Sequence, residues 1–498
     1  MKLVRFARRV YKNDRLLQLA LLVFMLVYFG VILDDAGFGA SRSLPQNLTF
    51  NSMLDHLLRG QFYVDPQTIR DEGFVRNGHV YSYFGIWCAL VRLPLRFLNL
   101  MWVDFTPWSC LMAVCVATMA KIRTVLFLRK QSASIPACRP ASERAYGLML
   151  LYVVLGGSAV AYLRASIYQE VVFWAVAFGA VFIYFSIKGI VLRQYSASTL
   201  SWMALAAGLA LLTRVSTGLG LYLALCLLLL VLMGQDVRDR LKERMSLGAA
   251  LRRAIVSRRT LVPVAILALL VIATGTVNYF RWGNPTTFVN YKLHLMNGYY
   301  PDRPVRASLY GFFNVRRIPF GLLYYFLPIW FVHNGSGHLL FESFQGRLFD
   351  AVELPPSSFF LTDLLPICFI GFLIYALKTR RSKALLPVSR WLALAAGLVV
   401  PCILMLAAIY MSYRYRMEFY PLIDLLAFLG LYAVVSDEAL LASFSRWRGW
   451  LITATVVSVV TSFAMLVLYE LSEFGPSREF LQGGIVHYYA DVVRHISL

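Results

Sequence analysis

Three acidic residues lie where a carboxylate could act on a substrate at a membrane surface. Asp34 and Asp35 directly follow an apolar segment and open the polar stretch 34–106, and Glu170 follows a short hairpin between two further apolar segments. A carboxylate at such a boundary can take the proton of an attacking hydroxyl group. Each position also has a structural interpretation, because acids commonly end a membrane span and Arg164 could pair with Glu170. The first pair suggests a general base, and Glu170 suggests a residue that orients the acceptor or the sugar.

Three arginines lie at the ends of apolar segments. Arg214 ends the segment GLALLTR, and Arg414 and Arg416 lie in the turn SYRYRMEFYP between two apolar runs. Arginine offers a planar fork of N–H donors that matches phosphate oxygens. These residues therefore predict a site for an anionic phosphate near the bilayer surface. The alternative is ordinary contact with lipid headgroups.

The stretch 281–318 combines basic and aromatic residues. Against the single acid Asp302 it holds six basic residues and several tyrosines: Arg281, Lys292, Arg303, Arg306, Arg316 and Arg317, with Tyr291, Tyr299, Tyr300 and Tyr310. Cations bind phosphate, and aromatic rings can stack on sugars. Lys292, Arg316 and Arg317 are therefore predicted to join the phosphate-sugar pocket. The alternative is a solvated loop with an interfacial belt of aromatic residues.

No metal cofactor is expected from the histidines or the cysteines. The histidines of the chain are scattered, and its seven cysteines form no CxxC pattern. Neither a zinc site nor a disulfide framework is therefore predicted. A divalent cation held by Asp34, Asp35 and Glu170 is the alternative.

The composition places these residues in a membrane protein. Of the 498 residues, 59% are hydrophobic and only 15% are charged, and the mean hydropathy is +0.64. Soluble proteins carry about 45–50% apolar and about 25% charged residues. This chain has more apolar surface than one core can bury and too few charges to cover it. The numbers predict a polytopic membrane protein and exclude a disordered chain, a coiled coil and a disulfide-rich secreted domain.

A membrane-spanning helix needs about 20 mainly apolar residues. Two apolar stretches, 85–103 and 318–333, are interrupted by arginine or proline, and we expect them to be interfacial or re-entrant. The chain 1–498 is then a single all-α membrane domain with about eleven spans, within a range of 10 to 13. The predicted spans are 16–33, 107–128, 146–163, 168–187, 199–213, 216–233, 261–280, 359–377, 391–412, 417–435 and 450–470.

The charge distribution predicts the orientation. The chain has 48 Lys and Arg against 26 Asp and Glu, a net charge of +22. If the N-terminus is cytoplasmic, 29 of the basic residues but only 7 of the acidic ones fall on the cytoplasmic side. Membrane proteins keep Lys and Arg on that side, so topology accounts for the excess and no nucleic-acid partner is expected.

Two large outer loops follow from this orientation, 34–106 and 281–358. Within the first, apolar residues recur at helical spacing between Leu48 and Phe62, which predicts an amphipathic helix on the membrane surface. The second contains the re-entrant segment 318–333.

Together these features resemble the GT-C superfamily of integral-membrane glycosyltransferases, which includes the protein O-mannosyltransferases and the lipid A aminoarabinose transferase. The matching features are Asp34-Asp35 after the first span, Glu170 between spans three and four, Arg214 after span five and the two large outer loops. The segments NGHVYSYFGIWCALVRLPL and YGFFNVRRIPFGLLYYFLP also look like bacterial members. The resemblance implies a GT-C-like fold, an Asp base and cations that hold a polyprenyl-phosphate donor. Asp35 is preferred to Asp34 as the base, because it lies one residue farther from the apolar segment, where an acceptor from water would meet it.

The expected function is that of an inverting glycosyltransferase of the bacterial cytoplasmic membrane with an external active site. Its partners would be a polyprenyl-phosphate sugar, membrane lipid, and a glycan, lipid or protein acceptor. A polymerase or ligase of lipid-linked glycans is one alternative, since it needs the arginines but not the carboxylate pair. A transporter or flippase is the other, and it should carry ionisable residues at mid-membrane, where Asp424 is the clear candidate.

Overall fold

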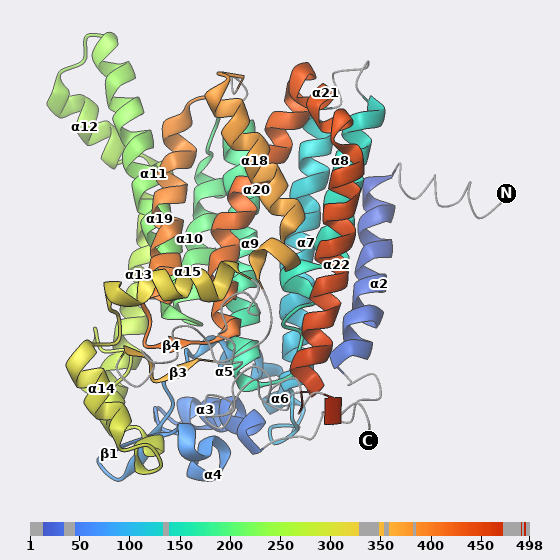
Figure 1. Cartoon of the computed structure of the whole chain (residues 1–498). Coiled ribbons are helices and arrows are strands. Elements are labelled where there is room, and N and C mark those ends of the chain that lie inside the picture. The colour runs from blue at the N-terminus through green and yellow to red at the C-terminus, as the bar shows by residue number, and fades with distance from the viewer. Residues whose placement is uncertain are drawn as a thin grey trace.

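The computed structural model shows a bundle of long helices with a layer of loops and short helices at one end (Figure 1). Asp34 and Asp35 lie outside the described residues, as do residues 328–333 of the predicted re-entrant segment. The described residues are 13–33, 45–132, 139–327, 348–352, 358–381, 385–471, 490 and 493–494.

Each of the eleven predicted spans overlaps a helix, although the predicted span 146–163 extends beyond the end of its helix at Leu155. In lipid a helix satisfies its own backbone hydrogen bonds, so long apolar runs adopt this structure. The helices are α2 (Asp14–Leu33), α7 (Thr106–Ser132), α8 (Arg139–Leu155), α9 (Ile167–Val191), α10 (Ala197–Leu211), α11 (Val215–Lys242), α13 (Arg258–Trp282), α18 (Leu364–Lys378), α19 (Val388–Ala407), α20 (Tyr420–Ser436) and α22 (Arg448–Leu471).

Within the described residues, eight helices are long and apolar enough to cross a membrane, counting α20 together with the 3₁₀ helix before it. α10 and α18 are apolar but shorter, and α8 has 17 residues with several charges in its first two turns. The predicted class, an all-α polytopic membrane protein, is confirmed, whereas the count of eleven spans is not established.

Short elements make up the rest of the described chain. The α-helices are α3 (Thr49–Leu58), α4 (Pro66–Ile69), α5 (Trp87–Val91), α6 (Leu93–Phe97), α12 (Leu247–Ile255), α14 (Asp302–Tyr310), α15 (Ile318–Phe326), α17 (Phe359–Thr362) and α21 (Glu438–Arg446). The 3₁₀ helices are Pro45–Leu48, Arg70–Glu72, Gly157–Ala159, Tyr291–Leu293, Leu295–Gly298, Val315–Arg317 and Tyr413–Phe419. Strands β1 (Phe74–Arg76) and β2 (His79–Tyr81) pair antiparallel, and β3 (Ala351–Val352) and β4 (Tyr410–Met411) pair parallel.

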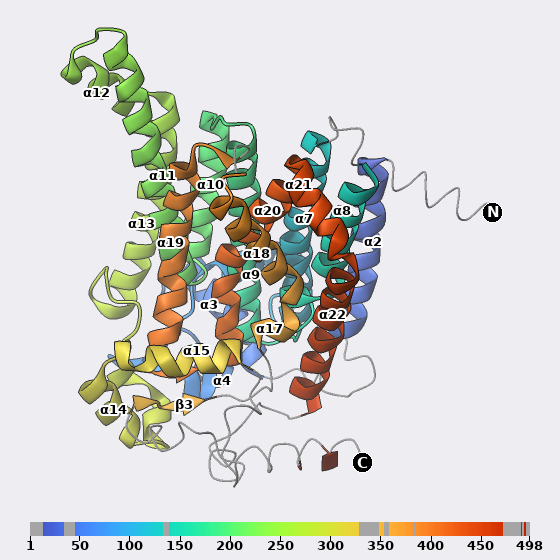
Figure 2. The same ribbon diagram turned by 45° about the horizontal axis from the view of Figure 1, so that its top comes forward.

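The two large loops meet at the same end of the bundle. Figure 1 shows α3 and α4 of the first loop and α14 and α15 of the second at the lower end of the long helices. The helix α15 runs across the lower ends of the spans in Figures 1 and 2. The opposite end carries α12 and α21. The predicted helix at 48–62 forms as α3, but most of its first eight residues are buried within this lower layer.

Two buried acidic side chains inside the bundle, Asp424 and Asp363, have basic partners. The Lys121 ammonium lies 2.9 Å from Oδ2 of Asp424, and both side chains are nearly buried. Asp363 accepts a hydrogen bond from the Tyr152 hydroxyl at 2.5 Å and one from Arg416 Nη2 at 3.4 Å. Asp424, on which the transporter hypothesis depended, therefore has a counter-charge, and it does not line the cavity described below.

Reporter fusions test the orientation. Fusions after Thr260 and Ser389 are expected to report a cytoplasmic location, because 234–260 has eight basic residues against three acidic ones and 378–390 has five against none. A fusion after Phe341 is expected to report an external location. A cytoplasmic signal at Phe341 would contradict the charge count, because 318–333 would then be a full span.

Candidate functional site

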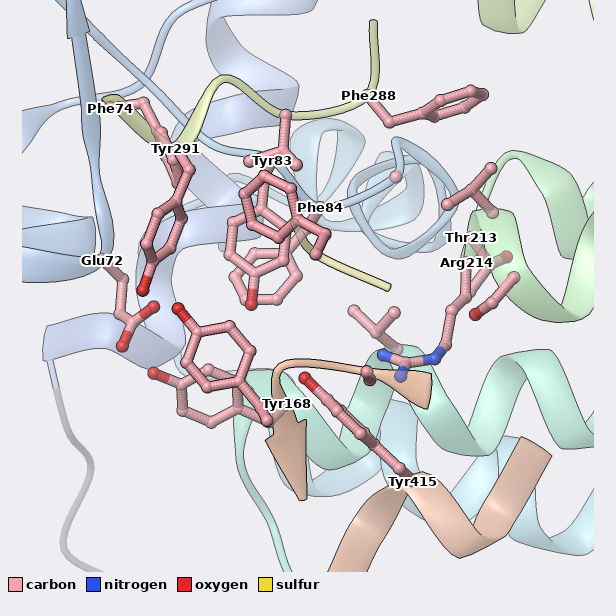
Figure 3. Close-up of a pocket in the computed structure, with 18 of the residues that line it drawn as sticks. Glu72, Phe74, Tyr83, Phe84, Tyr168, Thr213, Arg214, Phe288, Tyr291 and Tyr415 are labelled. Carbon is pink, nitrogen blue, oxygen red and sulfur yellow. The ribbon is translucent and has the colours of Figure 1, made fainter. Parts of the chain in front are cut away.

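A cavity of about 410 Å³ opens where the two large loops meet the ends of the spans. Its size lies within the range of pockets that bind small ligands. In Figure 3, Glu72 and Arg214 project from opposite sides, with tyrosine rings between them. The lining residues come from the first loop (Glu72, Phe74 and 83–86), the start of α9 (Tyr168 and Val171), the turn 211–216, the end of α13, the second loop (including Tyr291, His294 and Arg303) and the segment 405–415.

Glu72 supplies the carboxylate of this cavity. About one fifth of its side chain is exposed, and its Oε2 lies 3.8 Å from Nε2 of His294 in the other large loop. His294 is buried, and neither ring nitrogen has a hydrogen-bond partner within the described part of the chain. Buried polar atoms normally have a partner, and the Glu72 carboxylate lies within ion-pairing distance of Nε2.

Backbone contacts between the two loops fix the position of Glu72. The Leu295 N–H donates to the carbonyl oxygen of Gly73 at 3.0 Å, and Phe74 forms a β-bridge with His294. The rings of Phe74 and His294 also stack with their centroids 4.5 Å apart. Glu72 directly precedes these residues, so its side chain is held at the junction of the two loops.

The surroundings of Glu72 favour the ionised form. Burial raises the pKa of its carboxyl, but the neighbouring His294 and Tyr168 side chains and the charge of Arg414 outweigh that effect, so its pKa lies below the ordinary value of 4.5. At neutral pH the cavity therefore holds a carboxylate that can accept a hydrogen bond from a substrate hydroxyl.

Arg214 lies on the opposite side of the cavity. Its Nε donates to Glu418, which also accepts from the Ser216 and Thr217 hydroxyls at 2.6 and 2.5 Å. The terminal nitrogens of Arg214 donate no hydrogen bond within the described residues, and in Figure 3 they point into the cavity. The guanidinium carbon lies 5.0 Å from the ring centroid of Tyr415. Both terminal nitrogens are thus available for an anionic ligand.

Close backbone packing positions the turn that carries Arg214. The Trp87 N–H donates to the Leu212 carbonyl oxygen at 3.1 Å. A Cβ atom on Gly85 would lie 2.1 Å from that same oxygen, so only glycine fits there. The first loop is therefore in direct contact with the turn between α10 and α11.

Arg414 also lines the cavity, but its neighbour Arg416 does not. The guanidinium carbon of Arg414 lies 4.6 Å from the ring centroid of Tyr168. Arg416 is 1% exposed and donates from Nη2 to the Thr362 hydroxyl at 2.7 Å. Arg416 and Glu418 attach the 3₁₀ helix Tyr413–Phe419 to the bundle, and this attachment leaves Arg414 facing the cavity.

The basic residues of the second loop divide in the same way. Arg281 and Arg303 line the cavity, whereas Lys292, Arg316 and Arg317 do not. Lys292 and Arg316 are exposed. Arg317 is buried and donates to four backbone carbonyl groups, of Gly311, Phe312, Leu348 and Ala407. Its contacts are those of a residue that ties segments together.

Arg281 is a buried cation in the cavity wall. Its side chain donates from Nη1 to the Phe84 carbonyl oxygen at 2.7 Å, and it has no acidic partner within the described residues. Arg303, by contrast, pairs with Asp350 at 2.9 Å. A buried charge without a counter-charge is costly, so Arg281 adds to the attraction of this cavity for an anion.

Glu170 does not line the cavity. Its two carboxylate oxygens accept from Nη1 and Nη2 of Arg92 at 2.5 and 2.9 Å, and both side chains are fully buried. Arg92 also donates to Asn51 in α3 and to Thr106 in α7. The partner of Glu170 is thus Arg92 of the first loop, and Arg164 lies instead over the ring of Tyr469.

Of the residues that sequence analysis proposed for the site, Arg214 and Arg414 line the cavity, whereas Glu72 and His294 line it without having been proposed. Asp34 and Asp35 lie outside the described residues. Glu72 follows Asp71 in a polar stretch where acidic residues are common, so its type and neighbours gave no signal. His294 lay in the loop that was singled out, but it was considered only as a metal ligand.

Structural comparison finds similarity to solved structures that include AglB and ArnT. The archaeal oligosaccharyltransferase AglB from Archaeoglobus fulgidus, solved with an inhibitory peptide and a dolichol-phosphate, is 12% identical, with a TM-score of 0.45 over 95% of this chain and 57% of that one. ArnT from Cupriavidus metallidurans, solved with undecaprenyl phosphate, is 13% identical, with a TM-score of 0.38 over 95% of this chain and 74% of that one.

This chain thus spans little more than half the length of the oligosaccharyltransferase. No protein-family model matches the sequence, and no curated protein matches it significantly.

Proposed function

We propose that this protein is a glycosyltransferase of the bacterial cytoplasmic membrane. It transfers a sugar from a polyprenyl-phosphate-linked donor to an acceptor at the outer face, with inversion at the anomeric carbon. The observation that carries the proposal is the polarity of the cavity, with the free terminal nitrogens of Arg214 on one side and the Glu72 carboxylate on the other. A phosphate leaving group and an acceptor hydroxyl need these opposite environments.

The donor phosphate binds at the cationic side. Arg214 and Arg414 contact its oxygens, and Arg281 adds positive charge to the wall. The polyprenyl chain extends into the surrounding lipid, and the sugar lies among the aromatic rings of Tyr83, Tyr168 and Tyr415. As the bond between the anomeric carbon and the phosphate oxygen breaks, the preorganised cations stabilise the charge that grows on the phosphate.

The acceptor enters from the acidic side. Its hydroxyl oxygen attacks the anomeric carbon opposite the phosphate, and its proton passes to a carboxylate of the first loop. The sequence favours Asp35 or Asp34 as this base. Glu72 then has the orienting role that the sequence suggested for Glu170, because Glu72 faces the cavity and Glu170 is occupied by Arg92.

Exchanging Arg414 for Ala tests the phosphate site. A charged hydrogen bond contributes about 1.5–3 kcal/mol, so donor use is expected to fall roughly tenfold to a hundredfold in an assay with a labelled polyprenyl-phosphate sugar. Lys at this position should restore only part of it, because an ammonium lacks the planar fork. The matched control is Arg316→Ala, an exposed arginine outside the cavity. Equal donor use by R414A and R316A would remove Arg414 from the site.

Exchanging Glu72 for Gln tests the acceptor side. The KM for the acceptor is expected to rise roughly tenfold to a hundredfold, while donor binding stays unchanged. Because the pKa of Glu72 lies below 4.5, the wild-type protein should keep its acceptor affinity as the pH falls from 7 toward 4.5. Steady-state kinetics across this pH range, with each substrate varied in turn, separate the two effects. A rise in donor KM alone would contradict the assignment.

A further inference from the structure

The end of the molecule opposite the cavity carries a helix whose apolar face is only half covered by the chain. The helix α12 connects α11 and α13 and stands out beside the bundle in Figures 1 and 2. Ala250 and Ala254 are fully buried. Leu247, Leu251 and Ile255 are between 43% and 62% exposed.

The exposed residues form one stripe. Leu247, Leu251 and Ile255 are spaced four residues apart, so at about 100° per residue they fall within an arc of about 80°. The buried Ala250 and Ala254 border this arc on one side. The helix thus has a continuous apolar face, of which one part packs against the chain and the other faces outward.

Arg252 borders the stripe, about 100° round the helix from Leu251, whereas Arg253 lies about 200° from Leu251, on the opposite side of the helix. Arg252 and Arg253 are exposed on α12, and neither has an acidic partner within the described residues. Two of the three acidic residues in 234–260 are paired, with Asp236 lying 3.4 Å from Arg259 and Asp239 lying 3.0 Å from a lysine of its own helix. The third, Glu243, is exposed at the end of α11, and the same stretch holds eight basic residues. The surface around α12 therefore carries a net positive charge that the protein leaves unbalanced.

The position of α12 along the chain places it at the depth of the lipid headgroups. α11 has 28 residues, so it is about 42 Å long and exceeds a hydrocarbon core of about 30 Å. The apolar part of α13 begins at Leu261, whose side chain is 47% exposed. Only residues 256–260 separate it from α12, and Val256 among them is 58% exposed. The stripe on α12 therefore leads directly to the lipid-facing side of α13.

We propose that α12 is an interfacial anchor that binds anionic phospholipid headgroups of the cytoplasmic leaflet. Arg252, at the edge of the stripe, contacts the phosphates, and Arg253 adds positive charge from the opposite side of the helix. The stripe of Leu247, Leu251 and Ile255 lies at the boundary between headgroups and acyl chains. An exposed apolar stripe beside unbalanced positive charge is complementary to an anionic membrane interface, which offers both apolar acyl chains and negative phosphates. Neither water nor a neutral partner offers both. The proposal is independent of the proposed catalytic activity.

Hydrogen–deuterium exchange of the full-length protein in lipid nanodiscs tests the proposal. Amides of residues 247–256 are expected to exchange more slowly in discs that contain phosphatidylglycerol than in discs of phosphatidylcholine alone. Each arginine near an anionic surface contributes about fivefold to the equilibrium. The double variant R252Q/R253Q should lose the difference between the two lipids. The control R446Q/R448Q, which removes two exposed arginines from other helices, should keep it.

The triple variant L247S/L251S/I255S separates insertion from charge. It is expected to exchange rapidly in both kinds of disc, while the rest of the chain keeps its protection. Equal exchange of wild-type 247–256 in the two lipids would overturn the proposal. So would full protection of the triple variant, because contacts of Ala250 and Ala254 alone would then hold the helix. Protection that depends on the number of chains per disc would instead identify a second copy as the occupant.

Discussion

Replacing both Asp34 and Asp35 with Asn is expected to lower sugar transfer about 10²–10⁴-fold, the usual contribution of a general base. The substitution keeps the size of each side chain and removes only its charge, so membrane insertion should be normal. Of the single variants, D35N is expected to reproduce the loss and D34N to be mild. The measurement is transfer from a labelled polyprenyl-phosphate sugar by purified protein, normalised to the amount of folded protein.

The matched control for this experiment is Asp71→Asn, because Asp71 is an exposed carboxylate of the same loop and does not line the cavity. D71N should transfer sugar at the native rate. Native activity in the D34N/D35N variant would disprove the assignment of the base. If E72Q were then inactive at saturating acceptor, Glu72 itself would be the base, and the cavity geometry would still stand.

Replacing Glu170 with Gln is expected to destabilise the protein by about 3–5 kcal/mol, because it leaves the fully buried Arg92 without a counter-charge. The loss should be seen as a lower midpoint of thermal unfolding in detergent and a smaller yield of folded protein. Transfer per folded molecule should stay near the native value. The double variant R92M/E170M should recover part of the stability, since it removes both charges together.

One outcome of the E170Q experiment would show that Glu170 takes part in the reaction. If E170Q folds as well as the wild type and yet fails to transfer sugar, its carboxylate orients a substrate as the sequence suggested. Arg416 was also predicted in the site and does not line the cavity, and the variant R416A tests its role. Arg416 is buried against Thr362 and Asp363, so its loss should reduce stability more than donor affinity.

The sequence predicted the helices well because hydropathy reports the main constraint on them. A long apolar run in lipid must close its own backbone hydrogen bonds, whatever the rest of the chain does. The same reasoning found Arg214 and Arg414, since a cation at the end of an apolar segment needs an anionic partner nearby. Their positions at the ends of the spans were enough to predict that they face an anionic group.

The remaining residues of the site depend on contacts between distant segments. Glu72 faces the cavity because Phe74 and Gly73 pair with the loop around His294, and no local pattern encodes that pairing. For Arg317, a count of charges could not show that four backbone carbonyl groups already accept its hydrogen bonds. The number of charges in a loop predicts a positive environment. Whether each charged side chain already has hydrogen-bond partners depends on the tertiary structure.

The division of the cavity between helix ends and loops has an evolutionary consequence. Arg214 is held by Glu418 at the ends of two spans, whereas Glu72 and His294 come from two loops that join each other outside the bundle. Loops tolerate insertions and substitutions far better than packed helices do. If the proposed function holds, descendants of this protein can acquire new acceptors by changes in the loops while the arginine side of the cavity, and with it the lipid carrier, stays the same.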